Sequence, residues 1–460
     1  MTSSPVWGRE HDAHSFTLSA HTASGEGSAQ VSAGSTAEVA EDEPGSGADA
    51  AGGSRTDTVA NARPKPGPQP ATSGEGTRTR RGVASWPWVR TPHLLTPALI
   101  FLAIRAVGIV VLALMAEANN TTLTHSLTAW DGQWYLGIAS GGYSDVSFGL
   151  VDAHGTRDAN TALAFFPGYP YLVRLLALLP GVGLVSAAIV LSIISCVLGS
   201  YALLRIGERV GGSRRTGLLL VALFAAAPMA VVETMSYSEG MFCALAAWSL
   251  VGVLDRRWLL AGLCAAAAGL VRPTAAALVL AVCLAALVAI AARRDGWRPW
   301  LGGMVAPLGL LGYLGWVALR TGALNGWFAL QERGWDSHFD GGVATVRFTL
   351  KALTGSREML QLTTIGLLGV AIVLLVVSFR IGMPWPLLVY GVAVLVMDIG
   401  SNGLMNSKAR LLLPAFTLLI PVAVGLAKRR PSTAVGCVCG AVLFSSWFGA
   451  YALTVWPFAI

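Results

Sequence analysis

Apolar runs follow one another from about residue 93 to the C-terminus and leave this chain few ways to fold. Most runs approach the length of about 20 residues that a helix needs to cross a hydrocarbon layer of ~30 Å. The chain is 54% hydrophobic and only 12% charged, whereas soluble domains carry about 25% charged residues. Because a backbone surrounded by lipid must satisfy its own hydrogen bonds, the sequence predicts an all-α polytopic membrane protein.

Residues 1–86 have a different composition. They are rich in Ser, Gly, Ala, Thr and acidic residues and hold almost no aromatic or branched apolar side chains. Such a segment cannot bury enough surface to offset the entropy of ordering, and it lacks the apolar region of a signal peptide. We expect a disordered cytoplasmic tail at 1–86 and an integral membrane domain at 87–460.

The apolar runs predict about eleven membrane-spanning helices. Arginines cluster just before the first run, at positions 78, 80, 81 and 90, which places the N-terminus in the cytoplasm by the positive-inside rule. The predicted spans are 93–115, 183–206, 217–232, 241–255, 258–271, 275–292, 299–319, 361–379, 384–399, 409–427 and 434–455.

Charge in the loops supports this orientation. Predicted cytoplasmic connections hold most of the cations, whereas the short outer connections hold only Arg272, Lys408 and Arg410. The apolar segment 162–180 is interrupted by prolines, and counting it as a span would reverse every later helix. We therefore interpret it as a helix on the outer membrane face, and the C-terminus then also lies outside.

Several partner classes find no support in the sequence. The formal charge of +7 is no nucleic-acid signal, because the cations punctuate apolar segments and form no basic stripe. The six cysteines all fall inside apolar runs, which argues against a disulfide framework or a metal site. A divalent cation near Asp131 and Asp145 stays open, although no ligand spacing demands one. The expected partners include membrane lipids.

Two long loops are predicted on the outer side, at 117–182 and 320–360. They hold many aromatic residues together with carboxylates, and loops this long are usually functional or disordered. Aromatic faces stack on sugars, a carboxylate accepts a proton, and cations hold phosphate. Candidate substrate-binding residues are Trp130, Trp134, Tyr135, Tyr143, Asp145, Phe166, Tyr169, Glu239, Gln331 and Trp335, and candidate phosphate-binding residues are Arg272, Lys408 and Arg410.

Simpler explanations stand beside these. The aromatic residues fit an interfacial belt, the three cations fit snorkelling, and Glu239 fits a first-turn acid favoured by the helix dipole. Asp131 lies between Trp130 and Trp134, where a carboxylate is costly without a partner or a role, although capping of a short helix would also explain it. Arg105, within the first span, should pair with a buried acid, for which Asp398 is a candidate.

The loop residues resemble a known family. Trp130-Asp-Gly-Gln-Trp-Tyr135 and Ala164-Phe-Phe-Pro-Gly-Tyr-Pro-Tyr171 are similar to the first luminal loop of the glycosylphosphatidylinositol second-mannose transferases (PIG-V) and their bacterial homologues. Ser236-Tyr-Ser-Glu239, Gly269-Leu-Val-Arg272-Pro-Thr and Ser407-Lys-Ala-Arg410-Leu-Leu-Leu-Pro fit the same pattern. The resemblance covers about residues 95–427.

This resemblance implies a GT-C membrane glycosyltransferase, a hexosyltransferase and specifically a mannosyltransferase. Such an enzyme would take its sugar from a polyprenyl-phosphate donor and pass it to a glycolipid or glycan acceptor outside the plasma membrane. It implies that Asp131 is the general base, that the reaction inverts the anomeric carbon, and that no resident cofactor is certain.

Two other functions remain open at this point. A lipid or solute transporter would place charges and broken helices near the bilayer midplane. A non-catalytic glycolipid-binding scaffold would need the aromatic residues but not Asp131.

Overall fold

A computed structural model describes residues 91–146, 149–355 and 358–460. Apart from one isolated antiparallel bridge between Phe339 and Ser401, these residues form helices joined by turns and loops, and the predicted all-α class is confirmed. The predicted tail at 1–86 lies outside the described residues. The elements are α1 (Thr91–Ala118), α2 (Leu123–Leu127), α3 (Asp131–Gly141), η2 (Thr161–Ala164), α4 (Gly168–Leu176), α5 (Leu184–Gly211), α6 (Arg214–Ala225), η3 (Ala230–Thr234), α7 (Glu239–Leu254), α8 (Trp258–Gly269), α9 (Ala275–Ala291), α10 (Arg298–Val305), α11 (Leu308–Thr321), α12 (Gly326–Trp335), α13 (Val343–Gly355), α14 (Met359–Arg380), α15 (Trp385–Gly400), η4 (Met405–Ser407), α16 (Lys408–Leu411), η5 (Leu413–Leu419), α17 (Ile420–Ala427) and α18 (Pro431–Thr454).

The chain is a multi-pass membrane protein. Within the described residues, five helices are long and apolar enough to cross a bilayer. A sixth candidate is the pair Met405–Leu411 and Leu413–Ala427, which is bent by 54°. The five are Leu94–Ala118, Leu184–Gly211, Arg298–Thr321, Met359–Arg380 and Pro431–Thr454.

Each of the eleven predicted spans coincides with a helix or with consecutive helices. Four of them are apolar helices of 10–17 residues, namely α7, α8, α9 and α15, and α6 has 12 residues. A helix of 12 residues is only about 18 Å long, which is less than the hydrocarbon thickness. Full crossing by these five shorter helices stays a prediction. The segment 162–180 contains the end of η2, the nine-residue helix α4 and turns, and none of these is long enough to span.

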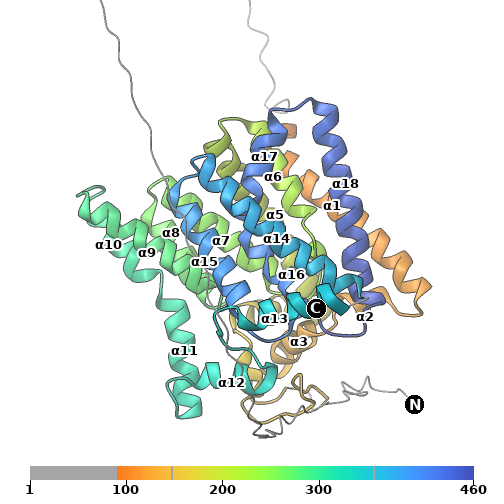
Figure 1. Cartoon of the computed structure of the whole chain (residues 1–460). Helices are drawn as coiled ribbons and strands as arrows, with labels where there is room; N and C mark the ends of the chain where they lie inside the picture. The colour runs from red at the N-terminus through yellow and green to blue at the C-terminus, as the bar shows by residue number, and fades with distance from the viewer. Residues whose placement is uncertain (1–90, 147–148, 356–357) are drawn as a thin grey trace, which may run out of the picture. The chain divides into compact units, whose positions relative to one another are not determined.

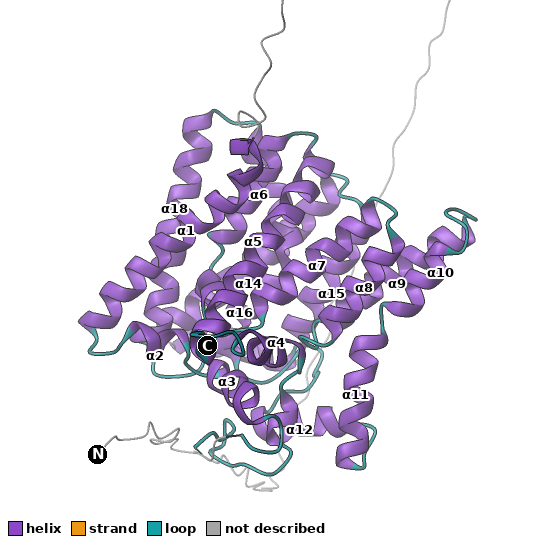
Figure 2. Cartoon of the chain, turned by 180° about the vertical axis from the view of Figure 1, so that it is seen from behind, coloured by secondary structure: helices purple, strands orange, loops and turns teal. Residues whose placement is uncertain are grey.

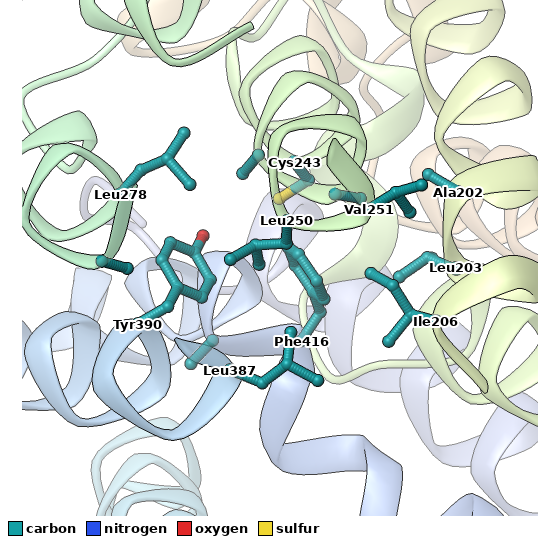
Figure 3. Packing of buried hydrophobic residues seen from close by; sticks show 14 of the residues in the cluster. Ala202, Leu203, Ile206, Cys243, Leu250, Val251, Leu278, Leu387, Tyr390 and Phe416 are labelled. Atoms are coloured by element: carbon teal, nitrogen blue, oxygen red, sulfur yellow. The ribbon is translucent and has the colours of Figure 1, made fainter. Parts of the chain in front are cut away.

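Small residues let several of the shorter helices approach their neighbours closely. α5, α7, α8 and α9 pack through Ala residues, and Gly199 of α5 and Gly252 of α7 lie against Ala244 and Ala261, as is typical of helix interfaces in membranes. Figure 3 shows Tyr390 of α15 and Phe416 of η5 beside Leu250 of α7. The Tyr390 hydroxyl donates to the carbonyl oxygen of Pro414 at 2.8 Å, which ties α15 to the kinked segment.

The buried charges pair differently from the sequence-based prediction. Arg105 donates to the carbonyl oxygen of Ala225 at 3.0 Å, and Glu233 is the acid whose charge acts on it. Asp398 instead lies beside Lys408, whose ammonium donates to the carbonyl oxygens of Asp398 and Ser401. The predicted Arg105–Asp398 pair is therefore wrong. The fold brings Arg105 close to Ala225 and Glu233, and it brings Asp398 close to Lys408.

Several short helices gather at one end of the bundle. Figures 1 and 2 show α2, α3, α12 and α16 at the end opposite α6. The two long loops also contact each other there. The amide of Ala153 donates to Gly334 at 3.0 Å, and His154 lies 3.4 Å from Asp336.

The close packing of α8 and α11 gives a test of the fold. A Cβ added at Gly309 would overlap the carbonyl group of Ala266, so Gly309→Ala must push the two helices apart. We expect a loss of about 1–3 kcal/mol, measured by thermal unfolding in detergent. Gly312→Ala, one turn further along α11 where a Cβ meets no atom within 4 Å, is the control and should not destabilise the protein. Equal stability of the two variants would contradict this packing.

Candidate active site

The Trp130-Asp131-Gly132 motif fixes where α3 begins. Trp130 has φ 57° and ψ −124°, a backbone conformation that is unfavourable for a bulky side chain and is found mostly where the surroundings impose it. A Cβ at Gly132 would collide with Ser236 Oγ. The amide of Ser236 in turn donates to the carbonyl oxygen of Leu127 at 3.0 Å. The motif therefore locks Asp131, the first residue of α3, against the segment that leads into α7.

Asp131 belongs to a network of four charged side chains. Its Oδ2 lies 2.6 Å from Arg410 Nη1. Arg410 Nε lies 3.4 Å from Oε1 of Glu239, and Arg272 Nη1 lies 2.8 Å from the same oxygen. Four segments supply these residues: the starts of α3 and α7, the turn before α9, and α16. The network thus joins regions up to 279 positions apart in sequence.

The four members differ in access to solvent. The Glu239 side chain is 0% exposed, whereas that of Asp131 is 28% exposed. A buried charge is costly unless it is paired, and two carboxylates balance two guanidinium groups here. Asp131 is therefore the one member that a substrate can reach readily.

Polar and aromatic neighbours hold the arginines in place. Arg272 Nη1 donates to Ser238 Oγ at 3.0 Å, and that hydroxyl also shares a hydrogen bond of 2.8 Å with Tyr135. Burial raises the pKa of Tyr135 to about 12, so its hydroxyl stays protonated at neutral pH. The guanidinium of Arg410 lies 5.2 Å from the ring centroid of Tyr237, a cation–π contact.

The second motif, Phe165-Phe-Pro-Gly-Tyr-Pro170, contacts the turn that carries Arg272. The amide of Gly168 donates to the carbonyl oxygen of Leu270 at 2.7 Å, and a Cβ at Gly168 would lie only 2.8 Å from that oxygen. The Tyr169 hydroxyl donates to Ala188 of α5 at 2.9 Å. The motif thus lies between α5 and the turn that carries Arg272, and it contacts both.

Most aromatic residues predicted to bind sugar lie in a packed core. Trp134 stacks on Phe165 with ring centroids 5.3 Å apart, and the Tyr143 hydroxyl donates to the Phe165 carbonyl at 2.7 Å. Five of the predicted aromatic residues are buried, and their rings contact protein atoms rather than solvent; they are Trp134, Tyr135, Tyr143, Phe166 and Tyr169. Their position indicates a supporting role beneath the network.

Three predicted residues keep part of their surface exposed. Trp130, next to Asp131, is half-buried. Trp335 lies with its ring centroid 6.4 Å from that of Trp134, and Gln331 donates from Nε2 to the Ala164 carbonyl at 3.0 Å. Trp335 and Gln331 border the aromatic core on the α12 side, whereas Trp130 packs against the separate cluster that contains Tyr237.

Two of the six charged residues predicted for the site do not join the network. Asp145 is exposed beyond the C-terminal end of α3, and α3 is about 16 Å long, so Asp145 is remote from Asp131. Lys408 caps the C-terminal end of α15 through the carbonyl of Ser401 at 2.8 Å. Within the described ranges no group of three or more His, Cys, Asp or Glu residues could hold a metal ion.

The structure adds two residues that the sequence-based site set omitted. Tyr237 and Ser238 contact Arg410 and Arg272, respectively. Both stand in the Ser236–Glu239 stretch, so their proximity to Glu239 in sequence was the available signal.

Comparisons with known proteins give a distant structural likeness. No protein-family model matches the chain, and no curated protein matches it either. Among solved structures, it is similar to ArnT from Cupriavidus metallidurans bound to undecaprenyl phosphate and to the same protein in the apo state. Both show 16% identity and a TM-score of 0.46, over 77% of this chain and 76% or 75% of theirs. A TM-score below 0.5 transfers neither activity nor ligand, so function must follow from the geometry of the network.

Glu239 gives a stability test of the network. Glu239→Gln keeps the shape of the side chain but removes the charge that faces both Arg272 and Arg410, which leaves buried positive charge uncompensated. We expect a loss of about 3–5 kcal/mol, measured by thermal unfolding. Glu208→Gln, which removes the acid of the exposed Arg214–Glu208 pair at 3.7 Å, should cost less than about 1 kcal/mol. Similar losses of stability in both variants would show that the buried charge of Glu239 does not stabilise the fold more than an exposed ion pair does.

Proposed function

We propose that this protein is a membrane glycosyltransferase that uses a polyprenyl-phosphate-sugar donor. The observation that supports it is the ion pair between a solvent-accessible carboxylate, Asp131, and a buried guanidinium, Arg410, at one end of a membrane bundle. Transfer of a sugar from a phosphate to a hydroxyl requires a base and an anion-binding group, and here the two are in direct contact.

Asp131 serves as the general base in this proposal. It takes the proton of the acceptor hydroxyl while the acceptor oxygen bonds to the anomeric carbon. The bond between that carbon and the phosphate oxygen breaks, and its electron pair leaves with the polyprenyl phosphate. Attack in line with the departing oxygen inverts the anomeric configuration.

Arg410 and Arg272 neutralise the departing phosphate. Both converge on Glu239 Oε1 and are held there before any substrate binds, so they stabilise developing negative charge with little reorganisation. Lys408 contributes indirectly, because its ammonium holds the end of α15 beside α16, which carries Arg410.

An apolar groove offers a place for the polyprenyl tail. It has a volume of about 570 Å³ and is lined by side chains of α9, α14 and α15. One end of its lining is near the network in sequence, since Ala276 and Ala277 follow Arg272 closely on α9. A tail in this groove would leave its phosphate near the arginines.

The remaining assignments follow from the sequence motifs. Mannose as the sugar, and a cell-envelope glycolipid or glycan as the acceptor, rest on the resemblance to the PIG-V family. The loop charges favour a cytoplasmic N-terminus and a site on the outer face of the plasma membrane. Nucleotide sugars are confined to the cytoplasm, so an outward site needs a donor that a lipid has carried across.

Asp131→Asn tests the catalytic role. The amide keeps the size of the side chain but accepts a proton poorly, so transfer from polyprenyl-phosphate mannose in membrane vesicles should fall by about 10²–10⁴-fold. Asp255→Asn is the matched control, because Asp255 also pairs with an arginine, at 3.4 Å from Arg209, and has a side chain 25% exposed. Asp255 follows α7 at the end opposite Glu239. Transfer at the wild-type rate in the Asp131 variant would exclude the base role and favour a scaffold or a transporter.

Filling the groove tests the site of the donor tail. Val392→Trp, on the α15 wall of the groove, should raise KM for a long-chain polyprenyl-phosphate sugar by about tenfold and leave kcat nearly unchanged, since only binding is affected. Val373→Trp on the exposed surface of α14 adds the same ring outside the groove and should leave KM unchanged. Equal KM values in the two variants would place the tail elsewhere.

A further inference from the structure

Arg410 has three partners that differ in how readily they can be exchanged. Glu239 is fully buried and Tyr237 is buried beneath the guanidinium, whereas the Asp131 side chain is partly exposed. The shortest of these contacts is nevertheless the one to Asp131, at 2.6 Å between Oδ2 and Nη1. The guanidinium therefore has two fixed partners and one accessible partner.

The charge of the network is already balanced without a substrate. Asp131 and Glu239 carry two negative charges, and Arg272 and Arg410 carry two positive ones. A phosphate that arrives at this site finds no unpaired cation. It binds a guanidinium most strongly if it replaces a carboxylate there.

A phosphate oxygen can take the place of a carboxylate oxygen on a guanidinium. Both are anionic acceptors of the planar donor groups of arginine, and both form short charge-assisted hydrogen bonds with it. Of the two carboxylates on Arg410, only that of Asp131 has exposed surface. Glu239 and Tyr237 would hold the guanidinium in position while that partner is exchanged.

We propose that Asp131 occupies the place of the donor phosphate on Arg410 in the free enzyme, and that donor binding displaces it and so releases the catalytic base. This inference rests on the proposed function. Asp131 is then a competing ligand within the protein as well as the base.

The exchange couples donor binding to proton transfer. Once the phosphate occupies Arg410, the site carries one excess negative charge, and Asp131 has lost its cation. Asp131 Oδ2, no longer held by Arg410 Nη1, can then accept the hydrogen bond of the acceptor hydroxyl, so the base is available only with the donor in place.

Binding of undecaprenyl phosphate, which carries no sugar, tests the exchange separately from catalysis. The affinity is measured on the full chain in nanodiscs by titration. Asp131→Asn removes the competing charge, so the lipid phosphate should bind about tenfold more tightly, which corresponds to about 1.4 kcal/mol. Asp255→Asn changes the net charge equally at the distant end of α7 and should leave the affinity unchanged.

The outcomes separate this inference from the proposed function. Unchanged or weaker binding by Asp131→Asn overturns the exchange, even if transfer is lost as the base role requires. A wild-type rate of transfer by the same variant overturns the proposed function, whatever its affinity. Thermal unfolding confirms that the variant is folded, and Asp131→Ala, which also removes the charge, decides the question if the asparagine variant is not.

Discussion

The site depends on a single buried carboxylate that holds two arginines. Oε1 of Glu239 lies 2.8 Å from Arg272 and 3.4 Å from Arg410, and the side chain has no exposed surface. Without it, two guanidinium groups would lie close together in a region of low dielectric, where like charges repel strongly. Because the two arginines come from the turn before α9 and from α16, Glu239 at the start of α7 also joins three parts of the bundle.

Close backbone contacts make this arrangement rigid. Gly132 lets α3 approach Ser236, and Gly168 lets the loop before α4 approach Leu270, where any side chain would collide or crowd a carbonyl. Each contact positions a segment that carries a charged residue, Asp131 in the first case and Arg272 in the second. The buried aromatic core beneath them fills the space between the loops, so its rings stabilise the site by packing, although their composition suggested sugar binding.

The sequence predicts much of this architecture for physical reasons that are local. Apolar run length locates the helices, and motif residues such as Asp131 and Arg410 identify the charged candidates. It cannot predict pairing between distant helices, which is why Arg105 was assigned to Asp398 and the role of Lys408 at the end of α15 was missed. Nor can composition tell a buried Trp134 from an exposed one, because both kinds of aromatic residue are common near a membrane surface.

Exposure separates Asp131 from the other charged residues that are paired within the bundle. The charges of Glu233 and Asp398 act on Arg105 and Lys408, respectively, and the two arginines of the site lie beside two acids, so every one of these buried cations has an acid to balance it. Such balance is expected of any charge inside a membrane bundle and carries no functional meaning by itself. Asp131 differs because its side chain is 28% exposed while its guanidinium partner is buried. When the acid of an ion pair is exposed and its cation is buried, another anion can replace the acid while the cation stays in place. This asymmetry is the physical basis for proposing a catalytic role for this network rather than for the other buried charges.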